Sequence, residues 1–291
     1  MEKRNCSLID AWNLYLDTRP LTKEANIKKE MNRFYKHIYL FWGDVELSNI
    51  HSKDIMMFQK SLFQKELSAQ TVKNCLSLLR ALYNRAKKYE IYKGDIPYFE
   101  MPSTNNARIR FLTEIEAKTL LDSLHKHSEL WHDITLFALH TGMRAGEIFS
   151  LNPSSINLSH KIVTIYETKN GTTRTIPLNN ITSTISKKYL LKQQRFLFSN
   201  SQILSVSKIF RQTVEDIGLN KNISNNREKF VFHSLRHTFA SWLVQKGIPL
   251  QIVSQLLGHK TLKITMRYAH LAPEQGFYAV TQLPYNISKH I

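Results

Sequence analysis

Residues 232–240, F-H-S-L-R-H-T-F-A, combine an apolar helical pattern with three basic side chains. We expect a helix over about 234–246, because apolar residues recur there at helical spacing. His233 and Arg236 are three residues apart, so both side chains lie on one helical face and can bind one phosphate. His237 lies about 100° round the helix from Arg236, and we expect it to pack or face elsewhere. The spacing alone is weak evidence, because helices with a basic solvated face also show it.

Two short motifs downstream supply another imidazole and a phenol. His259 follows Q-L-L-G, and the glycine predicts a helix C-terminus that leaves the imidazole free to reach a site. Tyr268 lies nine residues later, in M-R-Y-A-H. A tyrosine acts as a nucleophile only with cations nearby, because its ordinary pKa is about 10. Each motif also has a simpler interpretation, a capping histidine or a half-buried tyrosine that serves only the fold.

Two motifs upstream contribute cations. In T-G-M-R-A-G-E-I (residues 141–148), Arg144 can bind a phosphate through two nitrogens, and Glu147 is placed to orient the guanidinium. Lys169 begins an N-G turn between two expected strands, where a flexible amine can reach a site as a proton donor. Taken singly, a surface Arg–Glu pair and a solvated turn lysine are the commoner interpretations.

Together, five motifs resemble those of the tyrosine recombinase family, the phage-integrase and Xer-type site-specific DNA recombinases. In chain order they are T-G-M-R-A-G-E-I-F-S-L, T-K-N-G-T-T-R-T-I-P-L, H-S-L-R-H-T-F-A, L-L-G-H and M-R-Y-A-H. Each motif is modest alone, whereas all five in order and at family-like spacing are highly specific. The resemblance covers roughly residues 109–283. The helical N-terminal part resembles the family's core-binding domain by pattern rather than by motif.

The resemblance implies a reaction at a DNA phosphodiester. Tyr268 would attack the scissile phosphate, forming a 3′-phosphotyrosine and a free 5′-hydroxyl. Arg144 and Arg236 would bind the non-bridging oxygens, and His259 would donate a further hydrogen bond to them. Lys169 would protonate the leaving 5′-oxygen.

The same resemblance implies a role for the other histidine, an assembly of several protomers, and a reaction without cofactors. His233 would help accept the tyrosine proton or hold the phosphate. The phosphotyrosine conserves the bond energy, so we expect no ATP and no metal, and the sequence has no Walker-type glycine loop or carboxylate cluster. Four protomers on two duplexes are implied. The segment Leu271–Ile291 is a candidate for packing on a neighbouring protomer, or else it folds onto its own domain.

The biological setting follows only in outline. A gene on a prophage or another mobile element fits the resemblance best, with an accessory directionality or DNA-bending protein left open. Residues 1–7 leave no room for an additional arm-type DNA-binding domain, so we expect a simpler recombinase. Two alternatives also stay open. A type IB topoisomerase shares the chemistry but reseals the same strand, and a catalytically silent DNA-binding protein would share the fold.

The overall pattern predicts a mainly α protein with a small antiparallel β-sheet. Prolines, a glycine and a polar run at residues 93–110 predict a domain boundary. We expect a helical core-type DNA-binding domain over residues 1–105 and an α+β catalytic tyrosine-recombinase domain over residues 106–291. Strands are expected at Lys161–Ile165 and Arg174–Leu178. Thr113 and Glu116 have the spacing of a capping box, which predicts the start of a helix that reaches about Lys126. Helices are expected near 8–19, 23–39, 52–63, 69–89, 114–126, 130–140, 182–192, 204–217, 234–246, 250–257 and 262–270, with a last one after Pro273.

Composition favours nucleic acid as the partner. The formal net charge is +17 and the pI is near 9.8, a field that attracts a polyanion. The sequence shows no apolar membrane span and no signal peptide, so we expect a cytoplasmic protein. The two cysteines, Cys6 and Cys75, have neither disulfide-framework nor metal-ligand spacing.

Overall fold

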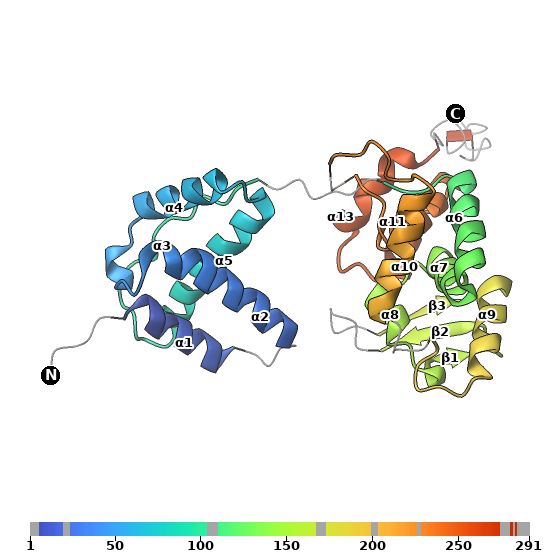
Figure 1. Ribbon diagram of the computed structural model, residues 1–291, viewed down its shortest axis with the longest axis horizontal. Helices are drawn as coiled ribbons and strands as arrows, with labels where there is room; N and C mark the ends of the chain where they lie inside the picture. Colours follow the sequence, from blue (N-terminus) through green and yellow to red (C-terminus); the bar gives the residue numbers. More distant parts are fainter. Residues whose placement is uncertain are drawn as a thin grey trace, which may run out of the picture. The chain divides into compact units, whose positions relative to one another are not determined.

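The computed structural model describes residues 6–19, 24–103, 110–166, 173–198, 203–225, 228–273, 280, 281 and 283. The chain divides into two units, Met1–Asn106 and Ala107–Ile291 (Figure 1). Each unit has its own hydrophobic core. No helix within the described ranges is long and apolar enough to span a membrane. Lys169, the turn expected at Asn170-Gly171 and most of the segment Leu271–Ile291 lie outside the described residues.

Side-chain caps and stacked aromatic rings define the first unit. Ser7 and Ser68 accept hydrogen bonds from backbone N–H groups in the first turns of their helices, which fixes where those helices begin. In the core, the rings of Trp12 and Phe34 stack with centroids 4.2 Å apart. The helices are α1 (Leu8–Thr18), α2 (Glu24–Arg33), α3 (Leu40–Trp42), α4 (Ser52–Gln64) and α5 (Ala69–Lys88), with a π-helical turn at Phe34–Tyr39 and a 3₁₀ turn at Leu47–Asn49.

The second unit contains the sheet and the remaining helices. Its strands β1 (Ile156–Asn157), β2 (Ile162–Ile165) and β3 (Arg174–Pro177) are antiparallel in the order β1-β2-β3, with Thr164 opposite Thr175. The strands lie together at one end of the unit (Figure 1). The helices are α6 (Glu114–His127), α7 (Glu129–Thr141), α8 (Ala145–Phe149), α9 (Asn180–Leu190), α10 (Ile203–Asp216), α11 (Ser234–Gln245), α12 (Leu250–Leu257) and α13 (Leu262–Thr265).

The expected fold class is confirmed, with local differences. The capping box of Thr113 and Glu116 begins α6 as expected. The single helix expected over 262–270 divides instead into α13 and a 3₁₀ helix, η5 (Met266–Leu271). Nine residues are too few for an apolar pattern to distinguish a 3.6-residue period from a 3.0-residue one.

Helix α11 is the centre of the second unit. It contacts α7, α12 and η5, and every residue from Ser234 to Ser241 is buried. The helix is therefore enclosed on all sides rather than on one face. Polar side chains that leave it in different directions all enter the protein interior.

Candidate active site

A sharp turn after α7 places Arg144 at the start of α8. Gly142 ends α7 with φ of +61°, and a Cβ there would lie 2.3 Å from the ring of Phe239, so only glycine fits. Arg144 is the N-cap of α8, and the carboxylate of Glu147 accepts its backbone N–H at 2.8 Å. The same carboxylate accepts Nη1 of Arg144 at 2.9 Å. Glu147 therefore orients Arg144, as its spacing predicts.

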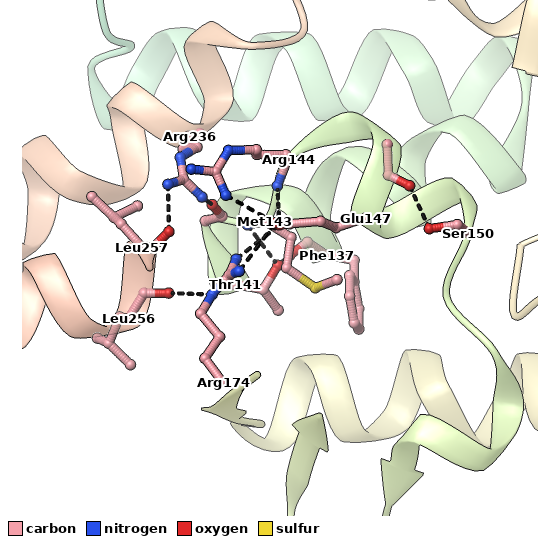
Figure 2. A network of polar contacts seen from close by, with 12 residues as sticks. Phe137, Thr141, Met143, Arg144, Glu147, Ser150, Arg174, Arg236, Leu256 and Leu257 are labelled. Atoms are coloured by element: carbon pink, nitrogen blue, oxygen red, sulfur yellow. Dashed lines mark hydrogen bonds and ion pairs between the residues drawn. The ribbon is translucent and has the colours of Figure 1, made fainter. Parts of the chain in front are cut away.

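Glu147 also holds a second arginine that the sequence reasoning did not single out. Arg174, in β3, donates from Nη1 and Nη2 to the two carboxylate oxygens at 3.0 and 2.8 Å, so Glu147 lies between two guanidiniums (Figure 2). Nε of Arg174 donates to the carbonyl of Leu256. A Cβ on Gly258 would lie 2.7 Å from Cδ of Arg174, so the missing side chain makes room for the arginine. The signal available in the sequence was an arginine in a short strand whose other residues are mostly apolar.

This shared carboxylate makes stability depend on pH. Hydrogen bonds from Arg174 and from Arg144 outweigh burial and lower the pKa of Glu147 to about 2. Because the pKa of Glu147 in the folded protein lies below the ordinary value of 4.5, the ionised carboxylate stabilises the fold at pH values above 4.5. That contribution is lost as the pH falls towards 2. We expect Glu147→Gln to lower the free energy of unfolding at pH 7 by about 3 kcal/mol, with the difference from wild type narrowing below pH 5.

Urea unfolding at pH 7, 5 and 3 measures this difference. The control is Glu129→Gln, because Glu129 is exposed and its ion pair with Lys188 is worth under about 1 kcal/mol. A difference between wild type and Glu147→Gln that stays constant with pH would contradict the prediction.

Arg236 is fixed by backbone carbonyls at the ends of two helices. Its side chain is 4% exposed, Nη1 donates to the carbonyl of Gly142 at 2.8 Å, and Nη2 donates to the carbonyl of Leu257 (Figure 2). Burial and then the positive charge of Arg144 lower its pKa to about 9. The guanidinium therefore remains charged at pH 7.

His259 follows the C-terminus of α12, as its glycine predicts. Gly258 adopts the left-handed conformation with φ of +63°, and Nδ1 of His259 lies 2.8 Å from Oγ1 of Thr265. Burial and then Arg236 and Arg144 lower the histidine pKa to about 4, so the ring is neutral at pH 7. When Thr265 donates to Nδ1, the ring proton is on Nε2 and is available for donation.

Tyr268 is buried in η5, and its partner corrects one sequence expectation. Its hydroxyl lies 2.5 Å from Nδ1 of His237, so His237 does not face elsewhere. The ring of His233 packs edge-on against that of His237, with centroids 5.1 Å apart. Burial raises the pKa of Tyr268, partly offset by Arg267 and Arg236. The expectation for His237 was wrong because α11 is enclosed on every side, so a residue 100° from Arg236 still faces protein.

These side chains line one small cavity, which we call the basic hollow. Its volume is about 160 Å³, and its lining residues are Arg144, His233, Arg236, His237, His259, Ile264, Arg267 and Tyr268. Five of the six residues singled out by sequence thus come together, and the sixth, Lys169, lies outside the described residues. The hollow joins cationic and neutral hydrogen-bond donors to one phenolic oxygen.

The family model of the phage integrase family matches residues 110–275, more than half of the chain. The chain belongs to the phage integrase family. This integrase-family chain is 30% identical over 219 residues to the integrase of Salmonella phage P22, covering 72% of the chain and 56% of the relative. It is 26% identical over 266 residues to a tyrosine recombinase of Thermosipho africanus, covering 88% of the chain and 91% of the relative. By family it is a tyrosine-type site-specific recombinase.

Solved structures share the fold of this phage integrase family member. The lambda integrase tetramer bound to a Holliday junction matches with a TM-score of 0.74 and 19% identity, covering 94% of this chain and 79% of that chain. A Tn1549 transposon integrase in complex with a circular intermediate DNA matches with a TM-score of 0.74 and 15% identity, covering 93% and 98%. At these identities the likeness concerns the fold alone.

Proposed function

We propose that the chain breaks and rejoins DNA at a specific site through a 3′-phosphotyrosine on Tyr268. The observation that carries this proposal is the basic hollow, in which the Tyr268 hydroxyl shares one cavity with the guanidiniums of Arg144 and Arg236. A phosphodiester in the hollow would meet a nucleophile and two cations together. Such fixed donors act most strongly in a buried site, where water does not screen them.

Each residue of the hollow has a chemical role in the proposal. Arg144 and Arg236 bind the non-bridging oxygens and stabilise the charge that develops as Tyr268 attacks. His259, neutral at pH 7, donates a hydrogen bond from its Nε2–H group to the same phosphate. His233 holds the phosphate from the start of α11. The phosphotyrosine conserves the bond energy, so the step requires neither ATP nor a metal.

We propose that Lys169 protonates the leaving 5′-oxygen. Lys169→Ala should slow strand cleavage on ordinary DNA, because an alkoxide is a poor leaving group without a proton. A sulfur in place of the 5′-bridging oxygen leaves without protonation, so the variant should recover on that substrate. The measurement is the rate of covalent adduct formation on both substrates.

The control for this prediction is Lys187→Ala, which removes an exposed lysine from α9. It should cleave both substrates at the wild-type rate. If Lys169→Ala stays slow on the sulfur substrate, its lysine does not protonate the leaving group.

The proposal extends to assembly and setting. We assign residues 1–105 to DNA-core binding and 106–291 to catalysis, with four protomers acting on two duplexes in the cytoplasm. The lambda integrase tetramer on a Holliday junction supports such an assembly. Relatives from phages P22 and 186 support an origin on a prophage or another mobile element.

A DNA screen tests the proposed function. Labelled fragments of the DNA that flanks the gene are incubated with the protein and resolved on denaturing gels for covalent adducts. We expect an adduct on one fragment, and two copies of that fragment on a plasmid should recombine. Adducts on every fragment together with relaxation of supercoils would instead indicate a topoisomerase. Binding without any adduct would indicate a silent DNA-binding protein.

A further inference from the structure

The hydrogen bond between His237 and Tyr268 joins the proposed nucleophile to a base. Nδ1 of His237 lies 2.5 Å from the Tyr268 hydroxyl, and the two residues are 31 positions apart in the chain. The ring centroids are 6.0 Å apart, so the contact is made by the nitrogen rather than by stacked faces. Packing of η5 against α11 therefore aims the hydroxyl at an imidazole nitrogen.

Both partners of this contact are enclosed. Tyr268 is 5% exposed and His237 is 7% exposed. Bulk water therefore has little access to the hydroxyl, and its proton must pass first to a group inside the protein. Burial also raises the pKa of Tyr268, so spontaneous ionisation at neutral pH is rarer than for a tyrosine in water. The hydroxyl needs a base within hydrogen-bond reach, and His237 lies within that distance.

We propose that His237 takes the proton from Tyr268 as the tyrosine attacks DNA. The proposal rests on the proposed function, in which Tyr268 is the nucleophile. The proposal gives the two histidines of F-H-S-L-R-H different roles: His233 binds the phosphate, and His237 accepts the tyrosine proton. In the step, the Tyr268 O–H bond breaks and its proton moves to Nδ1 of His237. The Oη–phosphorus bond forms, the bond from phosphorus to the 5′-oxygen breaks, and that oxygen takes a proton from Lys169.

The tautomer and the surrounding charges suit this transfer. Nδ1 can accept only when the ring proton of His237 is on Nε2, which lets the tyrosine hydroxyl donate. Guanidiniums near the hydroxyl stabilise the phenolate that forms, and a bound phosphodiester adds the negative charge that stabilises a protonated imidazole. The charged and titratable groups around the hollow are Arg144 before α8, His233 and Arg236 at α11, His259 after α12, and Arg267 in η5.

The test uses the fragment on which the wild type forms a Tyr268-dependent adduct, prepared with sulfur at the 5′-bridging position. Sulfur leaves without a proton, so the pH dependence of cleavage reports deprotonation of the nucleophile alone. His237→Asn places an oxygen close to the position of Nδ1, keeping an acceptor with almost no basicity. His233→Asn is the matched comparison at the neighbouring histidine. Ser241→Ala is the control within α11, since the buried Ser241 hydroxyl has no hydrogen-bond partner among the described residues.

We expect His237→Asn to cleave about a hundredfold or more slowly than wild type at pH 7, the usual contribution of a general base. Its rate should rise about tenfold per pH unit up to pH 9, because without a base the reaction depends on the ionised fraction of Tyr268, which grows tenfold per pH unit below the raised tyrosine pKa. His233→Asn should lose rate without gaining this slope, and Ser241→Ala should behave as wild type. Carbon-13 NMR of labelled tyrosine in the DNA-free protein reports whether Tyr268 keeps its hydrogen bond in each variant.

Four results would overturn the inference. His237→Asn could cleave at the wild-type rate. It could also be slower than wild type by the same factor at every pH, which would make His237 a positioning residue. It could cleave faster, which would make the contact a restraint on the tyrosine. The slope could appear in His233→Asn instead. Failure of the proposed function is distinguishable from all four, because the wild type itself would then form no Tyr268-dependent adduct.

Discussion

Tyr268→Phe should form no covalent DNA adduct while binding the target fragment as tightly as wild type. Phenylalanine keeps the ring that packs against α11 and α12 but has no oxygen to attack phosphorus. The cations that attract the phosphate remain, so binding should change by less than about twofold. Denaturing gels measure the adduct and electrophoretic shifts measure binding.

Tyr189→Phe is the matched control for this variant. Tyr189 is another buried tyrosine of the same unit, and it does not line the basic hollow. Removing its hydroxyl should leave adduct formation intact. Mass spectrometry of the DNA-linked wild-type peptide should find the linkage at Tyr268. An adduct in Tyr268→Phe, or a linkage at another residue, would refute the assignment of the nucleophile.

Arg236→Lys should slow adduct formation by about 10²–10³-fold, the usual effect of removing one donor that stabilises transition-state charge. The substitution keeps the net charge of +17, so the long-range attraction for DNA is unchanged. A lysine ammonium is a single point and cannot span the carbonyls of Gly142 and Leu257 while facing a phosphate. Single-turnover rates at saturating protein measure the effect.

The charge-matched control is Arg211→Lys, on the exposed side of α10. It should cleave at the wild-type rate. A rate for Arg236→Lys within about threefold of wild type would mean that charge alone, without the planar fork, suffices at this position. Thermal melting of both variants separates a catalytic loss from a loss of folded protein.

Much of the second unit could be predicted because the sequence patterns that indicate its elements span only a few neighbouring residues. The capping box at Thr113, the glycine that ends α12, and the pairing of Arg144 with Glu147 all depend on residues within a few positions. The structure places each as spacing predicts. The mainly helical fold with a small antiparallel sheet is also confirmed, since apolar periodicity is a local property.

Contacts between distant segments could not be predicted in this way. Arg174 reaches Glu147 across 27 positions, and His237 reaches Tyr268 across 31. Helical spacing shows which side chains share a face, but it does not show whether the opposite face is also buried. For α11 both faces are buried, so Arg236 and His237 enter the same hollow from different sides of the helix.

The way Arg236 is held has a consequence for the charge of the whole site. Helix-end carbonyls carry only partial negative charge, so they orient this guanidinium without neutralising it. Among the described contacts, Glu147 is the only carboxylate that touches an arginine of the hollow, and Arg174 shares it. The Arg236 side chain is therefore held rigidly and still contributes its full positive charge to the hollow. An ion pair would also hold the side chain, but it would neutralise that charge. The hollow therefore keeps a positive potential that attracts an anion.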